Sequence, residues 1–307
     1  MIDEVVPSAL DGQRLDRVVA LVADVSRAEA AAVVAAGGVT VDGHVASSGK
    51  LRLTEGQRIE VDPSAIPRAE PPVADVDVAF EVVHVDDHLV VVDKPAGLVV
   101  HPGAGNVDGT LVNGLLARFP ELAGVGDEER PGIVHRLDAG SSGLLVVART
   151  SEALDDLMAQ FASRAAGRTY TALVWGHPSA PHGVIDAPIG RDHRDPLRMA
   201  VVADGRPART EYEVVECYGR PNDLALLTCR LETGRTHQIR VHLTSIGHPL
   251  VGDTTYGGRR PVLGLTRPFL HAAALRFVHP ASGEELIFES VLPADLTDLL
   301  AQLQPAD

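Results

Sequence analysis

The first 62 residues carry the hydrophobic pattern of a small independent module. The apolar residues that share one predicted helix face are Leu15, Val18, Val19 and Val22. Ser26 and Glu29 form the capping-box pattern of a second helix that extends to about residue 36. The segment 39–45 is typical of a hairpin around Asp42-Gly43, and residues 57–61 are typical of a further strand. We therefore expect two helices followed by a small sheet.

A proline-rich stretch separates this module from the rest of the chain. Residues 63–75 contain four prolines and little apolar periodicity, which predicts an extended and semi-rigid segment. We place the module at 1–62, the linker at 63–78 and the main domain at 79–303. The tail from residue 302 onward is expected to be frayed.

The main domain is expected to hold many short strands and few helices. Helices are predicted at 109–116 and 151–165; on the second, one face that should be core carries Leu154, Leu157, Met158 and Phe161. The predicted strands are 80–85, 88–92, 133–134, 144–148, 168–175, 211–215, 224–231, 236–243, 273–277 and 286–289. On strand 168–175, one face carries Tyr170, Ala172 and Val174. This pattern favours an α+β domain on a largely antiparallel or mixed sheet.

One stretch of the main domain, 132–150, places a carboxylate between two apolar runs. It holds His135-Arg136-Leu137-Asp138 and then Ala-Gly-Ser-Ser-Gly, which predicts a tight turn between short strands. Gly140 and Gly143 suit a sharp backbone path, because glycine accepts conformations that other residues resist. A charge held beside buried strands is either paired in a structural salt bridge or placed for chemistry, and the pattern alone leaves both open.

Composition narrows the class of protein. Hydrophobic residues make up 45% and charged residues 22% of the chain, as in ordinary soluble globular proteins. We find no apolar run near the roughly 20 residues of a membrane span and no signal-peptide pattern at the N-terminus. Cys217 and Cys229 show no metal or disulfide spacing, so we expect small buried core residues and a reduced, cytoplasmic compartment.

The charge balance gives two opposing indications. A net charge of −15 at pH 7 argues by itself against nucleic-acid binding, which normally needs a basic surface. The segment 230–271 nevertheless holds six arginines, Arg259 among them, and two acidic residues. This local excess is consistent with a focused basic cleft, although a solvated arginine-rich surface would give the same pattern.

Three segments together resemble the RluA family of RNA pseudouridine synthases. The first is HRLD followed by x-x-Ser-Ser-Gly-Leu-Leu-Val-Val-Ala at 135–148, the second is 168–172 around Tyr170, and the third is 231–242, which contains Arg240. A Lys-Pro-x-Gly-x-x-x-His-Pro segment that begins at Lys94 is similar as well, and the likeness spans roughly residues 80–293. The chain departs from the family at Ala139-Gly140, where a charged pair is usual, whereas Asp138 keeps its spacing to Ser142-Gly143.

The resemblance implies roles for particular residues. Asp138 would be the catalytic nucleophile, Arg240 its ion-pair partner, and Tyr170 the residue that stacks on the base and assists proton removal. Arg136 would fill the space left by the extruded base. The remaining expected substrate contacts are Arg235 and Lys94 at phosphate, His135 orienting the turn, and Gln238 and Ile239 beside Arg240. On the predicted strand 236–243, Arg240 would share a polar face with Gln238.

The N-terminal module resembles the S4-type RNA-binding domain, which makes it a small α/β RNA-binding module. By that analogy its phosphate contacts are Arg14, Arg17, Arg27, Lys50 and Arg52. A protein-binding appendage is the alternative for this module. With the module included, the chain looks like the RluD-type branch, whose substrate is large-subunit ribosomal RNA; we therefore expect RNA, or its assembly particle, as the partner of a monomer.

No cofactor or metal is expected. The sequence has no P-loop and no dinucleotide fingerprint, and His237 and His242 lack the spacing of a zinc set. Two other functions stay open: an RNA-binding protein that assists ribosome assembly without needing catalysis, and a carboxylate-based nucleoside or glycoside hydrolase. The hydrolase would normally need a second catalytic acid, which the three segments do not offer.

Overall fold

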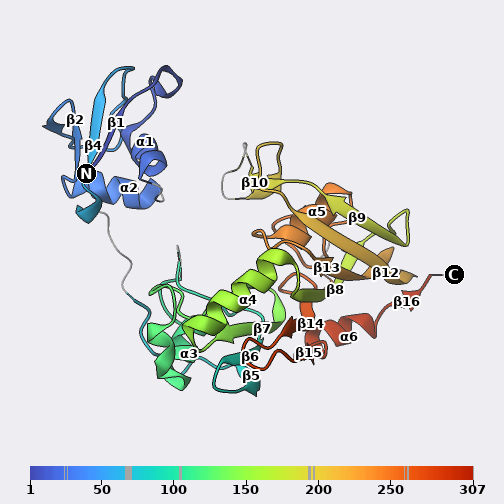
Figure 1. Ribbon diagram of the computed structural model, residues 1–307. Coiled ribbons are helices and arrows are strands. Elements are labelled where there is room, and N and C mark those ends of the chain that lie inside the picture. Colours follow the sequence, from blue (N-terminus) through green and yellow to red (C-terminus); the bar gives the residue numbers. More distant parts are fainter. Residues whose placement is uncertain are drawn as a thin grey trace. The chain divides into compact units, whose positions relative to one another are not determined.

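The computed structural model describes all residues except 24, 26, 66–70, 104–105, 193–194, 196–197, 259, 261–262 and 307. The predicted cap Ser26, the predicted basic residue Arg259 and the middle of the predicted linker thus lie outside the described residues. The chain divides into two compact units, Met1–Glu70 and Pro71–Asp307 (Figure 1). None of the described helices is long and apolar enough to span a membrane.

The first unit is a small sheet with two helices. Its elements are β1 (Ile2–Val5), a 3-10 turn (Ser8–Leu10), α1 (Leu15–Val22), α2 (Arg27–Ala35), β2 (Val39–Val41), β3 (His44–Val45), β4 (Arg58–Val61) and a second 3-10 turn (Pro63–Ala65). The strand order is β1-β4-β2-β3. The predicted helices and hairpin are confirmed, and the hairpin turn is made by Asp42 at φ 53° and Gly43 at φ 76°. Strand β1 was not predicted.

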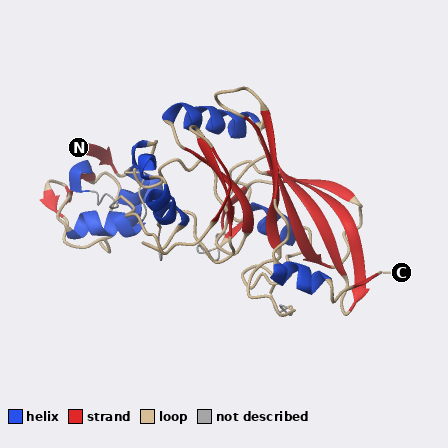
Figure 2. Cartoon of the chain, turned by 90° about the horizontal axis from the view of Figure 1, so that it is seen from below, coloured by secondary structure: helices blue, strands red, loops and turns tan. Residues whose placement is uncertain are grey.

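The second unit is built on one large mixed sheet (Figure 2). Its strands are β5 (Glu81–Val85), β6 (Leu89–Lys94), β7 (Ser142–Ala148), β8 (Gly167–Trp175), β9 (His182–Asp186), β12 (Arg209–Arg220), β13 (Leu224–Leu231), β14 (Leu270–Val278), β15 (Glu285–Glu289) and β16 (Gln304–Pro305). They run in the order β16-β12-β13-β8-β14-β7-β6-β5, with β15 on β14 and β9 on β12. Since β7 and β14 are parallel while β8 and β13 are antiparallel, the predicted α+β class with a mixed sheet is confirmed.

Helices cover both faces of this sheet. The helices are α3 (Leu111–Arg118), η3 (Pro120–Gly124), α4 (Ser151–Ser163), α5 (Gln238–Ser245) and α6 (Ala294–Leu300), and β10 (Ile189–Arg191) pairs separately with β11 (Met199–Val201). Helices α3 and α5 pack with Tyr170, Ala172 and Val174 of β8 in the largest core cluster. Leu173 lies in a different cluster, with α6. The predicted alternation of β8 is therefore confirmed.

Four local predictions are wrong. Residues 236–243 were expected to be a strand, but α5 occupies 238–245. Ile133 makes an isolated bridge to Val147 rather than a strand. Met158 is 51% exposed rather than core, although Leu157 of the same helix is fully buried. The tail is paired, not frayed, because β16 adds to β12 at the sheet edge.

Candidate active site

The turn that carries Asp138 is held in place by backbone hydrogen bonds and by the buried amine of Lys94. Leu137 is 4% exposed and belongs to the core, so its neighbour Asp138 is held at the core boundary. The Ser141 amide donates to the Asp138 carbonyl at 3.0 Å, and the Gly97 amide donates to the Ala139 carbonyl at 2.8 Å. The Asp138 side chain keeps 18% of its surface exposed, which leaves its carboxylate available on one side.

Gly143, the second residue of β7, lies at a position that needs glycine. Its φ of 112° lies in the region that side chains rarely adopt, and an added Cβ would lie 2.3 Å from the carbonyl oxygen of Ala272. The parallel pairing of β7 with β14 therefore depends on this position.

Arg240 lies between two carboxylates. Its Nη1 is 3.3 Å from Oδ2 of Asp138, while Nε and Nη2 donate to Asp253 at 2.7 and 3.0 Å. Burial acts to lower the pKa of Arg240, but the hydrogen bonds and charge of Asp253, together with the charge of Asp138, outweigh it and raise the pKa. The guanidinium thus stays charged in a nearly dry position, and the predicted Asp138–Arg240 contact is present.

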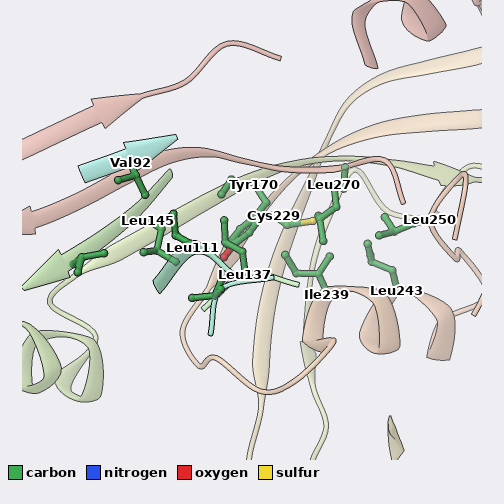
Figure 3. Packing of buried hydrophobic residues seen from close by; sticks show 14 of the residues in the cluster. Val92, Leu111, Leu137, Leu145, Tyr170, Cys229, Ile239, Leu243, Leu250 and Leu270 are labelled. Atoms are coloured by element: carbon green, nitrogen blue, oxygen red, sulfur yellow. The ribbon is translucent and has the colours of Figure 1, made fainter. Parts of the chain in front are cut away.

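Tyr170 is buried next to the turn that carries Asp138. It is 4% exposed, and Figure 3 shows its ring among the core residues, with the hydroxyl reaching toward Leu137. Burial raises the pKa of Tyr170, so the phenol stays protonated near neutral pH. The side chain therefore offers an aromatic surface and a neutral hydroxyl next to the Asp138 turn.

Asp138 and Tyr170 line one pocket of ≈ 910 Å³. Its walls come from the Asp138 turn, helix α4, strand β8 and the start of α5; the predicted site residues among them are His135, Arg136, Asp138, Tyr170, Arg235, Gln238 and Ile239. Leu137, Ile239 and Leu270 give it an apolar floor. A pocket of this size, lined by the carboxylates of Asp127, Asp138 and Glu232, by the rings of Phe161 and Tyr170 and by several guanidinium groups, fits a nucleotide base with its sugar.

His135 has the predicted orienting position. Its Nε2 accepts a hydrogen bond from the Val146 amide at 3.3 Å, and its ring packs 4.7 Å from that of Phe161. Burial, with a smaller effect of the Arg168 charge, lowers the pKa of His135 to about 3. A neutral ring that accepts from the backbone holds the turn against β7 rather than transferring protons.

The other residues predicted to bind substrate differ in their exposure and in how far their polar groups are already hydrogen-bonded within the protein. Arg136 is exposed at the pocket. Arg235 donates from Nε to the Pro207 carbonyl at 3.0 Å and keeps its remaining donors at the pocket wall. The side chain of Gln238 is hydrogen-bonded within the protein. Its Oε1 accepts from the Thr233 hydroxyl and from the backbone amide of Arg235, and its Nε2 donates to the Thr210 hydroxyl. Ile239 contributes only apolar surface.

Lys94 does not fit the predicted phosphate contact. It is 0% exposed and donates to the carbonyls of Pro95 and Leu98 at 2.8 Å and of Ala139 at 3.3 Å. Burial lowers the pKa of Lys94 to about 7, against the opposing effect of the Asp138 charge. The ammonium is closed off from any RNA and instead ties the loop after β6 to the turn that carries Asp138.

Several site residues were not predicted. Asp253, which anchors Arg240, also accepts the amides of Thr255 and Tyr256 at 2.9 and 3.1 Å. The ring of Tyr256 lies 5.0 Å from the Arg240 guanidinium, and its hydroxyl is 2.9 Å from Nδ1 of His237. Arg168 lines the pocket beside Tyr170. The segment around Asp253 and Tyr256 carried a family likeness, but no role followed from it.

The basic residues of the first unit that were expected to contact phosphate are exposed, except for the half-buried Arg14, and several already make contacts within the unit. Arg14 and Arg27 both pair with Asp16, at 2.5 and 3.0 Å. Arg52 donates to the Gly12 carbonyl at 2.7 Å. Arg17 bonds Gln13 at 3.0 Å, and Lys50 is exposed. Arg14 and Arg27 share Asp16, and the backbone of Arg14 bridges that of Arg52, so these three arginines lie close together; we call them the basic edge of this unit.

No metal site is found in the described part of the chain. Its His, Cys, Asp and Glu residues do not gather in any group of three that could hold an ion. Cys229 is buried and burial raises the pKa of its thiol to about 12, while Cys217 is partly buried; neither is bonded to the other.

Comparison with known proteins identifies both units. The model of the RNA pseudouridylate synthase family matches residues 88–245, and the S4 domain model matches residues 13–59. The ribosomal large subunit pseudouridine synthase D of Nitrosomonas europaea is 45% identical over 99% of this chain and 88% of its own length. The protein of that name from Xanthomonas campestris pv. campestris is 43% identical over 98% of this chain and 92% of its own length.

A solved structure agrees with these matches. Human RNA Pseudouridylate Synthase Domain Containing 1 superposes with a TM-score of 0.59 at 29% identity, over 75% of this chain and 89% of its own. The resemblance inferred from the HRLD segment and from the N-terminal pattern is thereby confirmed. The chain belongs to the RNA pseudouridylate synthase family, as an RluA-type isomerase of RNA uridine with an N-terminal S4 domain.

Proposed function

We propose that this enzyme converts specific uridines of large-subunit ribosomal RNA to pseudouridine. The full-length relatives from Nitrosomonas and Xanthomonas bear the name of ribosomal large subunit enzymes, which supports this choice of RNA. The observation that carries the assignment of the site is the contact of the buried Arg240 with Asp138, which lines a pocket together with Tyr170.

Asp138 is the proposed catalytic carboxylate. The reaction breaks the bond between C1′ of the ribose and N1 of uracil, and a nucleophile next to C1′ captures the electron-deficient carbon. Arg240 orients the carboxylate, because Nη1 of its charged guanidinium lies 3.3 Å from Oδ2 of Asp138. The base then turns, C5 attacks C1′, the carboxylate is released, and the C5 proton is lost while N1 gains one.

Tyr170 and Arg136 are the proposed handlers of the base. The Tyr170 ring stacks on the extruded uracil, and its protonated hydroxyl assists transfer of the C5 proton. Arg136 is exposed at the pocket, where it fills the gap that the uridine leaves in the RNA stack. Arg235 contacts the backbone phosphate, and the basic edge of the S4 domain adds affinity without base recognition.

The test is the variant Asp138→Asn with a large-subunit ribosomal RNA transcript. We expect no pseudouridine to form, because the amide cannot act as a nucleophile, whereas RNA affinity and melting temperature stay within error. The matched control is Asp155→Asn on the exposed side of α4, which should keep wild-type turnover. Mapping pseudouridines in ribosomal RNA with and without the gene then identifies the uridines.

Three results would contradict the proposal. Turnover by Asp138→Asn would remove the carboxylate from the mechanism. Rescue of a deletion phenotype by the same variant would favour an assembly protein whose catalysis is incidental. Free uracil released from the transcript would favour a hydrolase.

A further inference from the structure

Arg168 is a buried guanidinium without an anionic partner. It is the second residue of β8 and is 8% exposed. Its Nε has no hydrogen-bond partner, and no carboxylate of the described residues forms an ion pair with it or contributes to its pKa. Burial lowers the pKa of Arg168, yet a guanidinium remains charged at neutral pH. The chain thus keeps an uncompensated positive charge inside its pocket, which is costly unless a ligand uses it.

The surroundings of Arg168 hold it in place. The guanidinium lies 5.0 Å from the centre of the Phe161 ring on α4. The guanidinium has room because residue 234 is glycine: a Cβ on Gly234 would lie 2.7 Å from Nη1 of Arg168. Arg164 and Arg209, by contrast, both pair with Glu232. Arg168 is therefore positioned by packing and is not neutralised by Glu232, one of three acidic residues that line the pocket.

Arg168 and Tyr170 point to the same side of β8. Residues two apart on a strand share a face and lie roughly 7 Å apart, and both of these line the pocket. Burial has the largest effect on the pKa of Tyr170 and raises it. The charge of Arg168 lowers this pKa, and the charge of Asp138 raises it. A uracil ring stacked on Tyr170 would accordingly have the carboxylate on its sugar side and the guanidinium within reach of its own oxygens.

We propose that Arg168 stabilises the negative charge that the uracil ring carries once its bond to the ribose has broken. This inference rests on the proposed function. When the C1′–N1 bond breaks, its electron pair stays with the base and is delocalised over N1 and the ring carbonyl oxygens. A guanidinium donates to such an oxygen in a pocket of low dielectric constant. The same electron pair is then used by C5 to form the new bond to C1′, so no oxidant or further reactant is needed.

The depth of Arg168 favours the base over the RNA backbone as its ligand. A phosphodiester stays close to solvent while the base enters the pocket, and Arg136 and Arg235 are the more accessible guanidinium groups. The apolar side chains near Tyr170 are Leu137, Ile239 and Leu270, which suit a flat ring. A backbone role is one of the outcomes that the experiment separates.

The experiment compares two transcripts of large-subunit ribosomal RNA, one made with uridine and one with 5-fluorouridine. Fluorine on C5 withdraws electrons and stabilises the ring anion by itself, so the reaction should then depend less on Arg168. The variants are Arg168→Met, Arg168→Lys and the control Arg276→Met, whose arginine is exposed and paired with Glu285. Loss of the starting nucleoside at the target is followed under single-turnover conditions with saturating enzyme, by chromatography of nuclease digests.

We expect Arg168→Met to slow the uridine transcript by about 100- to 1,000-fold, as for the loss of one donor to a developing oxyanion. The loss with the 5-fluorouridine transcript should be at least tenfold smaller, and Arg168→Lys should fall between wild type and Met. RNA affinity should stay within about threefold, and Arg276→Met should match wild type. A partly misfolded variant would lower both rates equally, so the ratio between transcripts reports the charge.

An equal loss with both transcripts would overturn the assignment. Weaker RNA binding with an unchanged rate at saturation would also overturn it and would place Arg168 at a backbone phosphate. Both results require an active wild-type enzyme, so they leave the proposed function intact. A wild-type chain that converts neither transcript contradicts the proposed function instead.

Discussion

Arg240 is bound more closely by Asp253 than by Asp138. Nε and Nη2 meet the two oxygens of Asp253 at 2.7 and 3.0 Å, whereas Nη1 is 3.3 Å from Asp138. The Asp253 side chain is fully buried, and that of Asp138 is 18% exposed. Asp253 thus anchors the guanidinium, and in the proposed mechanism the longer contact leaves the Asp138 carboxylate free to move toward the substrate.

Asp253→Asn should impair catalysis without removing any group that touches RNA. The amide no longer balances the Arg240 charge, so the guanidinium moves toward Asp138 and its orientation is lost. We expect a single-turnover rate about 100-fold lower, as for a small misplacement of a reacting group. The free energy of unfolding should fall by about 3 kcal/mol, because one partner of a buried pair is lost. Rapid-quench kinetics and denaturant unfolding measure the two effects.

Glu285→Gln is the matched control for this change, because Glu285 pairs with Arg276 on the surface. It should alter stability by no more than about 1 kcal/mol and leave the rate unchanged. If Asp253→Asn turned over at the wild-type rate, Arg240 would not need its anchor.

Lys94→Met should change how stability depends on pH. Burial lowers the pKa of Lys94 from its usual 10.5 to about 7 in the folded chain. Between these values the unfolded chain binds a proton that the folded chain does not, so the Lys94 contribution to the free energy of unfolding rises with pH. The rise is at most about 1.4 kcal/mol per pH unit, and below pH 7 the contribution is flat.

The measurement is the difference in free energy of unfolding between wild type and Lys94→Met, from denaturant titrations between pH 6 and pH 10. Wild type should gain on the variant as pH increases above 7. A difference that stays constant would mean that Lys94 keeps an ordinary pKa. Since Lys94 also holds the Ala139 carbonyl, the variant should lower turnover at all pH values.

The chemistry of the site could be predicted from sequence better than its local structure. The HRLD segment and Arg240 are 102 positions apart, yet their contact followed from family likeness and from the need of a carboxylate for a cation. The alternation of β8 likewise predicted that Tyr170 shares a face with Ala172 and Val174, and all three lie in one core cluster. These predictions rest on patterns that are local or on pairs of opposite charge.

Burial and loop geometry could not be predicted from the sequence in the same way. Residues 238–243 alternate between polar and apolar, which favours a strand, but His237 at φ 57° starts a helix of eight residues instead. Lys94 ends an apolar strand, and the sequence does not show that its amine turns inward to three carbonyls. The pairing of Arg240 with Asp253 depends on the turn that contains Asp253 and Thr255, and tertiary contacts set the path of this turn.

Gly143→Ala should destabilise the second unit strongly. The new Cβ would lie 2.3 Å from the Ala272 carbonyl oxygen and would hold alanine at φ 112°. Both effects act on the parallel pairing of β7 with β14, so we expect a loss of about 3 kcal/mol or more. Denaturant unfolding followed by near-ultraviolet circular dichroism measures it.

Gly124→Ala serves as the comparison for this substitution. An added Cβ at Gly124 meets no atom of the described residues within 4 Å, and its φ is not in the left-handed region. Its effect should stay within about 0.5 kcal/mol. Equal losses in the two variants would show that the close approach at Ala272 relaxes without cost.

Arg136→Ala should matter most when the target uridine is paired. Arg136 is exposed at the pocket, and its proposed task is to fill the gap left in the RNA stack. Extruding a base costs a few kcal/mol, and less when the base is already unpaired. We therefore expect a 10- to 100-fold lower rate on a hairpin that contains the mapped uridine and less than a threefold change on a single strand of the same sequence. An equal loss on both RNAs would assign Arg136 to phosphate or base contact rather than to the vacated stack, and Arg276→Ala should leave both rates unchanged.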